Sequence, residues 1–486
     1  MQTAEQLCGL LPYNVLPIQH KFLLTTRYGA WVLLDASDFE KVKQNSLTPE
    51  LYKKLEAAGV VATPENLKEI VRNYRSINAN MLTGPSLHII SVTVRCNFNC
   101  AYCHTSSPLA KGVDMTKETA TRVLKNVFKT PNKSVTIEFQ GGECLLNWET
   151  VKFIITNAQK LNELEKKDLR ITAVTNLSLM TEERLTFLLD NNVSLCTSLD
   201  GPAVVHDKNR PLRGELVTYP VVTHWIKRIQ DVGKKRGKEH IIGALPTITK
   251  HSLSYARQIV DEYVVHGFTD IHLRPLNYLG IAITRWPEIG YTAEEFIIFW
   301  KEAAEYILAL NKKGVRIKER MLSIMLTKIL QKKDPFYTEL MSPCGAGRTQ
   351  IAYEYDGSVY TCDEGRMLGE DLFKLGHVMT ENYTEFMASD TLLSTMTASL
   401  LDNYNCKMCA YLPWCGTCPV INVSEQGNII PKIKESMKHK IYFAQFSFLF
   451  EKMVEDPDAE AIFRSWVSPH FGCIPLPSEL VKGCHK

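Results

Sequence analysis

The sequence predicts an α/β protein that contains a partial (β/α)6 barrel of the TIM type, a small N-terminal α+β unit and a C-terminal cysteine-rich domain. Two observations predict this architecture. Strand and helix patterns alternate six times within residues 85–312, which is typical of a parallel sheet with right-handed crossovers. Cysteines then gather within residues 344–418. Because six units are fewer than the eight of a closed barrel, the predicted barrel is open.

Residues 1–84 are expected to form the N-terminal unit. Its predicted elements are two short strands followed by two helices: Phe22–Thr26, Ala30–Leu34, Ala36–Lys43 and Pro49–Ala58. Thr48 is placed to cap the second helix, and Gly59 is placed to end it. A hairpin with helices can capture a peptide by strand addition, or it can serve only as a structural cap on the barrel.

The barrel region is expected over residues 85–312 and the C-terminal domain over residues 313–486. The predicted barrel strands are Leu87–Val94, Val135–Phe139, Arg170–Thr175, Val193–Leu199, Ile241–Ile248 and Asp270–Pro275. The cysteine-rich part has little apolar core of its own, so metal is expected to stabilise it. A final amphipathic helix is predicted over residues 433–455.

The composition excludes several classes of protein. The 486 residues carry 56 basic and 53 acidic side chains, and this balance offers no strong field for nucleic acid. No apolar run of about 18 residues appears, so no membrane partner is expected. The first residues lack a secretory signal pattern, so a cytoplasmic location is expected. In a reducing compartment, 14 cysteines fit metal binding better than disulfides.

The first cysteine group follows the first predicted barrel strand. Cys96, Cys100 and Cys103 have the spacing Cys-x₃-Cys-x₂-Cys. Three thiolates can hold three irons of a [4Fe–4S] cube and leave the fourth iron open to an amine and a carboxylate, such as those of a methionine moiety. A zinc site that borrows His104 is the alternative, although Cys103 and His104 would be awkwardly adjacent ligands.

This motif resembles that of the radical S-adenosylmethionine (SAM) superfamily, with Tyr102 in its aromatic position. The resemblance covers about residues 85–310. Gly141-Gly142-Glu143, after the second strand, is similar to the family motif whose backbone and carboxylate hold the methionine amine. Cys144 stands where the family usually has proline. The resemblance therefore implies S-adenosylmethionine and one [4Fe–4S] cluster as cofactors.

Three later strand ends extend the resemblance. Thr175-Asn176 matches a pair that lies near the cofactor in the family. The stretch from Ser198 to Arg210 is similar to one in peptide-modifying members, which implies that Ser198 and Asp200 lie near the ribose and Arg210 near the cofactor carboxylate. Without the family, Arg210 is an ordinary loop arginine. Leu273 ends the sixth strand, where family members approach the adenine through the main chain.

The second group of cysteines resembles the SPASM (twitch) domain, a C-terminal extension with two auxiliary [4Fe–4S] clusters. Its spacing departs from the family in having two residues before the last cysteine of the run, and zinc ribbons are the alternative. The resemblance implies two ligand sets, namely Cys344, Cys362 and Cys418 for the first cluster, and Cys406, Cys409 and Cys415 for the second.

Two further residues gain roles from this resemblance. His439 occupies the place of a later family cysteine, and it is expected to replace that thiolate unless Cys473 or Cys484 does so. Its alternative is an ordinary helix-surface histidine. Asp363 follows Cys362 directly, where an aspartate takes a proton from the substrate in sulfatase-maturing relatives. Its alternative is a solvated turn.

The whole chain looks most like the maturase of the His-Xaa-Ser peptide system. The residues that carry this resemblance are Leu10–Asn14, Gly84–Ile89, Ile137–Glu143, Asp261–Val264, Leu273–Leu276 and Ser465–Val467. It implies a ribosomally made precursor peptide as substrate, hydrogen abstraction by a 5′-deoxyadenosyl radical, an oxidative cross-link as product, and an external one-electron donor of the flavodoxin or ferredoxin type.

Two other functions remain open from the sequence. A sulfatase-type maturase that makes formylglycine shares the cysteine layout and Asp363. A non-catalytic iron–sulfur or zinc scaffold would keep the cysteines, but it would not need Gly141-Gly142-Glu143.

Overall fold

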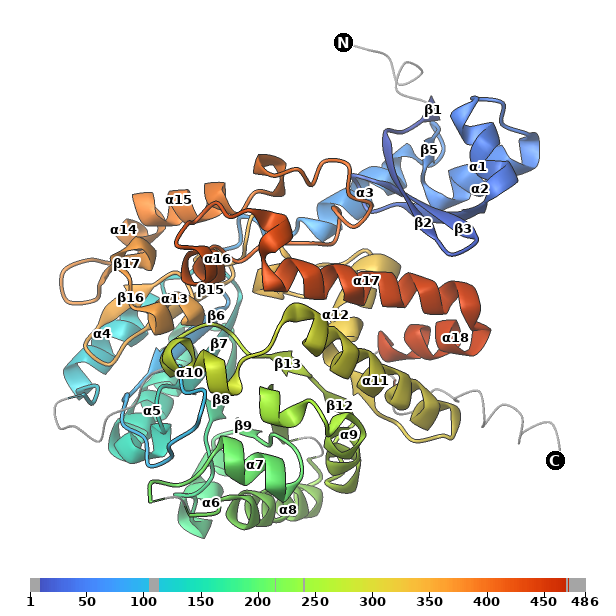
Figure 1. Ribbon diagram of the computed structural model, residues 1–486. Coiled ribbons are helices and arrows are strands. Elements are labelled where there is room, and N and C mark those ends of the chain that lie inside the picture. Colours follow the sequence, from blue (N-terminus) through green and yellow to red (C-terminus); the bar gives the residue numbers. More distant parts are fainter. Residues whose placement is uncertain (1–8, 105–112, 215, 239–240, 469–470, 472–486) are drawn as a thin grey trace.

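The computed structural model describes residues 9–104, 113–214, 216–238, 241–468 and 471. Its N-terminal unit forms a lobe beside the rest of the molecule (Figure 1). The lobe contains β1 (Gly9–Leu10), β2 (Tyr13–Ile18), β3 (Lys21–Thr26), β4 (Trp31–Asp35), α1 (Ala36–Lys43), α2 (Pro49–Ala58), β5 (Val61–Ala62) and α3 (Leu67–Ile77). Strands β2, β3 and β4 form an antiparallel sheet, and β1 pairs with β5.

Both predicted helices of this lobe have the expected bounds. The Thr48 side chain accepts from the Leu51 N–H, Pro49 takes the first position, and Gly59 adopts the left-handed conformation that ends α2. Strand β2 of this sheet was not predicted. Pro17 interrupts it, and its side chains do not alternate cleanly between buried and exposed. Helix α3 was not predicted either.

The barrel region begins with five parallel strands in the order β10-β9-β8-β7-β6. They are β6 (Leu87–Ser91), β7 (Ser134–Gln140), β8 (Asp168–Val174), β9 (Val193–Ser198) and β10 (Ile242–Leu245). The helices among and after them are α4 (Lys117–Val127), α5 (Trp148–Glu165), α6 (Glu182–Asp190), α7 (Ala203–Asn209), α8 (Tyr219–Lys235) and α9 (Ala256–Val265). The strand ends that carry the predicted motifs therefore meet at one end of this sheet.

The last two predicted barrel strands are each divided. Pro246 lacks an N–H and separates β10 from β11 (Thr247–Ile248). The sixth is split into β12 (Asp270–Ile271) and β13 (Arg274–Pro275). Short parallel pairs then continue the wall, because β13 pairs with β11 and β12 pairs with β14 (Lys318–Glu319). The described residues therefore do not form one uninterrupted six-stranded ladder.

The cysteine-rich region extends the barrel sheet instead of standing apart from it. β15 (Gln350–Tyr353) pairs in parallel with β6, and β16 (Ser358–Tyr360) and β17 (Lys374–His377) follow antiparallel, which gives an eight-stranded mixed sheet. The helices after the barrel are α10 (Ile281–Ile289), α11 (Ala293–Lys312), α12 (Arg320–Gln331), α13 (Asp363–Leu368), α14 (Tyr383–Met387), α15 (Asp390–Ala398), α16 (Pro419–Gln426), α17 (Met437–Glu455) and α18 (Pro457–Trp466).

Helix α17 connects the three regions, in agreement with the helix predicted over residues 433–455. It packs against α11, α12 and α18, and it also touches β2 of the N-terminal lobe (Figure 1). Trp31 of that lobe meets Phe450 of α17 edge-to-face at 5.4 Å between ring centroids. One large apolar core thus runs from the barrel helices into the C-terminal helices, with Trp300, Trp414 and Trp466 fully buried in it.

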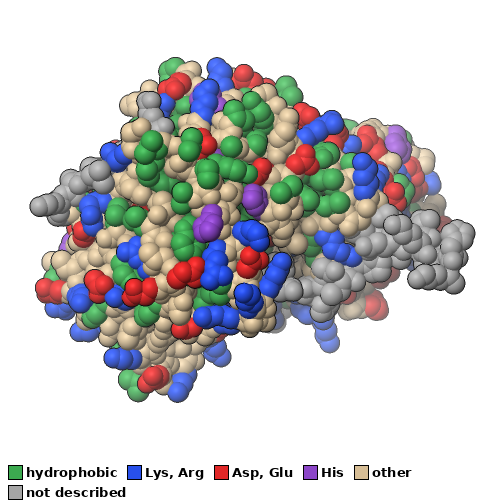
Figure 2. All heavy atoms as spheres, turned by 90° about the horizontal axis from the view of Figure 1, so that it is seen from below, with side chains coloured by type: hydrophobic (Ala, Val, Ile, Leu, Met, Phe, Trp, Pro, Cys, Tyr) green, Lys and Arg blue, Asp and Glu red, His purple; other side chains and the backbone are tan. Residues whose placement is uncertain are grey.

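The surface is mixed in charge. Basic and acidic side chains lie interspersed over the barrel face that Figure 2 presents. Ion pairs link neighbouring helices, such as Arg228 with Glu182 and Arg257 with Glu302. Among the described helices, none is long and apolar enough to pass through a membrane.

Candidate cofactor and cluster sites

The loop that carries Cys96, Cys100 and Cys103 is fastened to the end of β7 by backbone contacts. The Gly142 N–H donates to the Thr93 carbonyl at 2.8 Å, and the Glu143 N–H donates to the Arg95 carbonyl at 2.7 Å. A Cβ atom on Gly142 would lie 2.0 Å from the Arg95 oxygen, so only glycine permits this approach. The two glycines therefore set the position of the cysteine loop.

Glu143 ties the second strand end to the third. Its carboxylate is buried and accepts from the Thr175 hydroxyl and the Asn176 N–H, each at 2.7 Å, and from the Leu145 N–H at 3.0 Å. Burial raises the pKa of this carboxyl, and the hydrogen bonds oppose that rise. The Asn176 amide donates to the Asn97 side chain at 3.0 Å and lies 3.9 Å from the Cys96 sulfur.

A buried network joins the cysteine loop to the fourth strand end. Arg210 Nη1 donates to the Tyr102 hydroxyl at 2.7 Å, and this hydroxyl donates to Asp200 Oδ2 at 2.8 Å. The Thr247 N–H also donates to Asp200, at 3.2 Å. Burial raises the pKa of Cys100 to about 11, and the nearby Arg210 charge acts in the opposite direction. Tyr102, Asp200 and Arg210 are thus brought together, as positioning groups for the loop.

The remaining predicted residues of this site lie at strand ends. Ser198 is the last residue of β9 and is partly buried. The Leu273 N–H donates to Glu319 Oε1 at 3.3 Å, so this amide is occupied by the side chain that caps α12. The Leu273 side chain itself is buried in the main core.

The donor set fits an iron–sulfur cluster with a polar ligand. Burial raises the pKa of Cys96 to about 12, and the charges of Cys100, Glu143 and Cys103 add to the rise. Ser91 Oγ, His104 Nε2 and Arg210 Nε are buried polar atoms that lack a hydrogen-bond partner within the described ranges. As they stand, no three His, Cys, Asp or Glu side chains of the described residues converge on a single metal ion.

Residues 90–258 match the model of the Radical SAM superfamily. The chain therefore contains a radical SAM domain. The family uses S-adenosylmethionine and a [4Fe–4S] cluster, and its members similar to this chain include enzymes. The matched residues include the cysteine loop, Gly141-Gly142-Glu143 and the Tyr102–Asp200–Arg210 network.

Two kinds of named relatives are similar in sequence. The radical SAM cyclopropyl synthase TigE of Paramaledivibacter caminithermalis is 28% identical over 202 residues, which are 38% of this chain and 40% of TigE. The chain thus spans less than half the length of TigE. A cysteine-type anaerobic sulfatase-maturating enzyme of Clostridium perfringens is 25% identical over 376 residues, which are 74% of this chain and 95% of that enzyme.

Solved structures have a fold similar to that of this chain over more residues than the radical SAM domain contains. Native anSMEcpe with bound AdoMet superposes with a TM-score of 0.64 at 20% identity, and the match covers 78% of this chain and all of that one. Streptococcus suis SuiB bound to its precursor peptide SuiA superposes with a TM-score of 0.53 at 12% identity, over 87% of this chain and 98% of that one. At these identities the likeness establishes the fold alone.

Outside the radical SAM domain, the structure brings Cys344, Cys362 and Cys418 into one buried cluster. Cys362 lies at the N-terminal cap of α13, and its sulfur accepts from the Gly365 N–H at 3.3 Å. Cys418 caps α16, which packs against α13. Burial raises the pKa of Cys362 well above its ordinary value, and Cys344 and Cys418 add to the rise.

Cys406, Cys409 and Cys415 form a second group, next to the N-terminal lobe. Burial raises the pKa of Cys415 to about 12, with Cys409 and Cys406 contributing. The lobe is hydrogen-bonded to the same loop, because Asn14 donates to the Cys409 carbonyl at 3.0 Å and Thr25 donates to the Ala410 carbonyl at 2.7 Å. The position of the lobe is therefore coupled to this cysteine loop.

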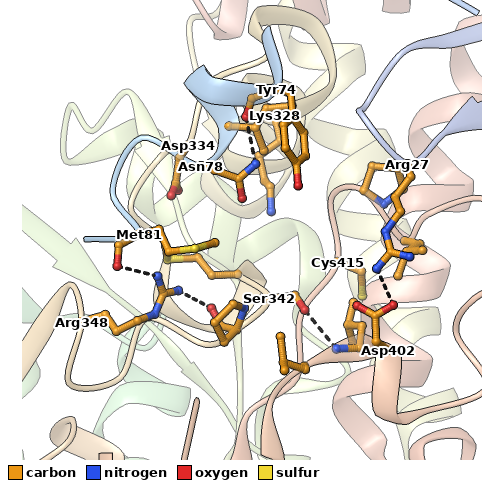
Figure 3. Close-up of a pocket in the computed structure, with 17 residues that line it drawn as sticks. Arg27, Tyr74, Asn78, Met81, Lys328, Asp334, Ser342, Arg348, Asp402 and Cys415 are labelled. Carbon is orange, nitrogen blue, oxygen red and sulfur yellow. Dashed lines mark hydrogen bonds and ion pairs between the residues drawn. The ribbon is translucent and has the colours of Figure 1, made fainter. Parts of the chain in front are cut away.

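A cavity of about 400 Å³ lies between this loop, α3 and α12 (Figure 3). Its wall includes Cys415, and an ion pair between Arg27 of the lobe and Asp402 lines one side. Lys328 donates to the Leu340 and Trp414 carbonyls, and burial lowers its pKa to about 8. The cavity thus reaches Cys415 of the second later group.

His439 and Asp363 have well-defined surroundings. His439 lies half-buried in the first turn of α17 with its ring 6.2 Å from that of Phe443, and burial, followed by the Lys434 charge, lowers its pKa. Asp363 is held by Arg366, whose Nε and Nη2 donate to Oδ1 at 3.0 and 2.8 Å. Cys473 and Cys484 lie outside the described residues.

Charged residues between the barrel and the C-terminal region were not predicted. Arg274 pairs with Glu364, and Lys438 pairs with the buried Glu339, while Glu138 lies partly buried on β7. Burial raises the pKa of Glu138, and Asp363 adds to the rise, which places the start of α13 near the inner face of β7. The alternation of Val135, Ile137 and Phe139 with polar residues could have identified Glu138, but no local pattern identifies the other four.

Proposed function

We propose that this protein is a radical SAM enzyme that modifies a ribosomally synthesised precursor peptide, with an oxidative cross-link as the product. The observation that carries the radical chemistry is the joining of Cys96–Cys103, Gly141–Glu143 and the Arg210 network at one end of the sheet. The peptide substrate is supported by the resemblance to the His-Xaa-Ser maturase family, and by the likeness in fold to a SuiB structure that holds a precursor peptide.

The side chains of this site would bind and orient the cofactor. When bound, the cluster and S-adenosylmethionine supply a 5′-deoxyadenosyl radical that removes a hydrogen atom from the substrate. Cys96, Cys100 and Cys103 would hold three irons, with Tyr102 and Arg210 fixing the loop. Glu143 would orient Thr175 and Asn176 and, with the backbone of Gly141 and Gly142, would face the methionine end.

The polar groups of the next strands would contact the rest of the cofactor. Ser198 and Asp200 are proposed near the ribose, Arg210 near the carboxylate and the Leu273 main chain near the adenine. The buried Nε–H of Arg210 has no hydrogen-bond acceptor among the described residues. Since buried donors are normally paired, this supports a cofactor oxygen as its acceptor.

The two later cysteine groups would hold auxiliary [4Fe–4S] clusters, which could accept the electron that a substrate radical must lose. Cys344, Cys362 and Cys418 would hold the first cluster, and Cys406, Cys409 and Cys415 the second, with His439 as candidate fourth ligand of the second. Asp363 would act as the base that takes the substrate proton. The grouping of the thiols in space supports the first two assignments.

The N-terminal lobe would recognise the leader part of the precursor. The lobe is hydrogen-bonded to the Cys409 loop, and a cavity lies beside Cys415. Both features support a role in which a peptide bound to the lobe lies close to the proposed second cluster. An external flavodoxin- or ferredoxin-type protein would supply the first electron. Deleting residues 1–80 should then abolish leader-peptide affinity, as measured by fluorescence anisotropy. Unchanged affinity would leave the lobe as a structural cap.

A second candidate function is sulfatase maturation, in which a protein residue becomes formylglycine. The match to 95% of the length of a cysteine-type sulfatase-maturating enzyme favours it. Mass spectrometry separates the two products, because formylglycine made from cysteine has oxygen in place of sulfur and two hydrogens fewer, whereas a cross-link only loses two hydrogens. A scaffold without catalysis is the third candidate.

The deciding experiment is anaerobic reconstitution followed by incubation with S-adenosylmethionine, dithionite and a synthetic His-Xaa-Ser precursor. We expect 5′-deoxyadenosine and a peptide lighter by two hydrogens. If the precursor peptide keeps its mass while a sulfatase-derived peptide acquires formylglycine, sulfatase maturation would be favoured. Absence of 5′-deoxyadenosine in every mixture would favour the scaffold.

Two variants test the finer assignments. Asp363→Asn should abolish the peptide product while 5′-deoxyadenosine still forms without coupling, because radical generation does not need the base. His439→Ala should change the Mössbauer spectrum of one auxiliary cluster. A spectrum that stays the same would remove His439 from the ligand set.

A further inference from the structure

A groove of about 470 Å³ opens between the end of the barrel region and the C-terminal region. Its walls come from four helices and the segments next to them, namely α10, α11, α16 and α17. The radical SAM site and the two later cysteine groups use none of its side chains. Three aromatic rings and three carboxylates line it: Tyr278, Trp286, Tyr291, Glu294, Glu425 and Glu435.

The aromatic wall of the groove is fixed in place by its own contacts. Trp286 meets Tyr278 edge-to-face at 5.1 Å and Tyr291 at 6.3 Å between ring centroids. A Cβ atom on Gly290 would lie 2.4 Å from the indole, so glycine lets this ring lie against the backbone. The Tyr291 hydroxyl donates to the Ile248 carbonyl at 2.9 Å. The rings are therefore positioned before any ligand arrives, which lowers the entropic cost of binding.

The charges that line the groove are mainly negative, with three carboxylates against the single ammonium of Lys440. This ammonium already pairs with Glu294 at 2.8 Å. Glu435 pairs with Lys432 at 3.5 Å, but both side chains are more than half exposed, so this pair is weak. The groove therefore presents an excess of negative charge to a ligand.

Glu425 is the carboxylate of the groove that most needs a cation. Its Oε2 accepts from the Met437 N–H at 3.4 Å, and no ion pair to it is found among the described residues. Burial raises its pKa, and the Lys438 charge, the Met437 N–H and the Ser436 hydroxyl oppose the rise. Lys438 is itself paired with Glu339. A carboxylate that is partly removed from water gains stability when a ligand cation pairs with it.

Aromatic rings together with carboxylates recognise an ammonium or a guanidinium group. The described cations that lie over aromatic rings use other rings, so none of them occupies Tyr278, Trp286 or Tyr291. The carboxylates would repel an anionic ligand, and an apolar ligand would leave Glu425 without a cation. The groove therefore fits a ligand with a basic side chain, and its volume is in the range of ligand pockets.

The groove adjoins the cysteine loop of the radical SAM domain. The Ile281 N–H donates to the Cys103 carbonyl at 2.9 Å, and a Cβ atom on Gly280 would lie 2.2 Å from the His104 carbonyl oxygen. Tyr278 stands two residues before Gly280, which is a chain distance of at most about 7 Å. A peptide anchored in the groove would thus have its neighbouring residues close to this loop.

We propose that this groove binds a basic side chain, lysine or arginine, of the precursor peptide and thereby selects the stretch that is modified. The inference deepens the proposed function and rests on it, since it takes a peptide as the substrate. The cation would lie against the ring of Trp286 and pair with Glu425, while the next residues of the peptide extend toward the cysteine loop. Trp286 and Glu425 are then specificity-determining residues.

The test measures how four fluorescein-labelled peptides bind to the full-length, reconstituted protein, by fluorescence anisotropy. The peptides are Gly-Gly-Lys-Gly-Gly and its counterparts with arginine, norleucine or glutamate in the central position. The lysine and arginine peptides should bind at least about 10-fold more tightly than the norleucine peptide, which has the same chain without the cation. High salt should reduce this preference, because it screens the carboxylates.

Three variants and a control locate the site. Glu425→Gln and Trp286→Leu should each remove most of the preference for the basic peptides. Glu425→Lys should raise the affinity for the glutamate peptide, which a groove that is merely damaged would not do. Glu288→Gln is the matched control, because Glu288 lies on α10, pairs with Arg285 and does not line the groove. It should bind the peptides as the wild type does.

Three results would overturn the proposal. One is equal affinity of the wild type for the lysine and norleucine peptides, and another is a preference that survives in both Glu425→Gln and Trp286→Leu. The third is loss of binding in Glu425→Gln with no gain for the glutamate peptide in Glu425→Lys, because that pattern indicates a structural role.

Failure of the proposed function gives a different result. If the wild type prefers the basic peptides but no peptide substrate loses two hydrogens in the presence of S-adenosylmethionine and dithionite, the cation site stands and the proposed reaction fails. If a precursor is cross-linked while the basic peptides bind no better than the norleucine peptide, the reaction stands and the cation site fails.

Discussion

The cysteine loop of the radical SAM domain and the first auxiliary cysteine group hold similar thiols in different electrostatic surroundings. Beside Cys96–Cys103, the buried acids Glu143 and Asp200 accept hydrogen bonds on both oxygens. Two residues after Cys362, the Glu364 side chain is partly exposed and pairs with Arg274 at 3.3 Å. The acids of the first region are thus fixed by several donors each, whereas the described contact of Glu364 is a single ion pair.

The two regions also differ in how the cysteines are positioned. The first loop depends on glycine backbone contacts at the end of a strand, at distances that no other residue permits. The second group depends on two helix caps and on charged side chains that come from distant parts of the chain. We therefore expect small backbone changes to disable the first region and charge changes to disable the second.

The largest effect should come from Gly142→Ala, which disturbs the backbone contact between the end of β7 and the cysteine loop. The added methyl would lie 2.0 Å from the Arg95 oxygen, so the cysteine loop must move. Since a displacement of about 1 Å at an active site can lower the rate by about 100-fold, 5′-deoxyadenosine formation should fall at least that far. Liquid chromatography of the reaction measures it. Gly243→Ala is the matched control, because its methyl would meet nothing within 4 Å.

Arg210→Gln tests whether the first region also depends on a buried charge. The change removes the cation beside Tyr102 and leaves Asp200 without it, so the free energy of unfolding should fall by about 3 kcal/mol. Denaturant titration followed by tryptophan fluorescence measures this loss. Arg228→Gln, which breaks an exposed pair with Glu182, should cost less than about 1 kcal/mol. Equal losses in the two variants would contradict the role of the network.

Arg274→Gln tests the charged surroundings of the second region. If Cys344, Cys362 and Cys418 hold the proposed cluster, loss of this cation should lower the potential of that cluster, and the free energy of unfolding should fall by about 1–2 kcal/mol because the pair with Glu364 is lost. EPR redox titration follows the potential. Arg285→Gln, which removes an exposed partner of Glu288, is the control. A shift confined to the SAM-binding cluster would contradict the assignment of Arg274 to the auxiliary group.

The smallest effect concerns Glu319, which accepts from the Leu273 N–H and caps α12. Burial raises the pKa of this carboxyl to about 7, so the folded state binds a proton more tightly than the unfolded state. The resulting stability is complete below about pH 4.5 and is lost as the pH rises through 7. Glu319→Gln should therefore flatten the fall in unfolding free energy between pH 5 and 7, measured by urea titration. A profile as steep as that of the wild type would refute this.

Local patterns allowed much of the fold to be predicted. The bounds of α1 and α2 follow from apolar spacing together with Thr48, Pro49 and Gly59, which act within one helical turn. The four strands β6 to β9 follow from short apolar runs, to within a few residues. The division of the later strands and the extra strand β2 were missed, because proline and irregular burial weaken a period-2 signal.

The sequence by itself determined the motifs on which the proposed chemistry of the first site rests, since the spacing of Cys96, Cys100 and Cys103 and the glycines that admit their loop lie in short contiguous stretches. Only the tertiary structure decided which charges surround the later cysteines. Arg274 and Glu364 are 90 residues apart, and Lys438 is 99 residues from Glu339. Such pairs form because β15 joins the barrel sheet at β6 and α17 packs across both regions, and no period in the sequence encodes a contact over that separation.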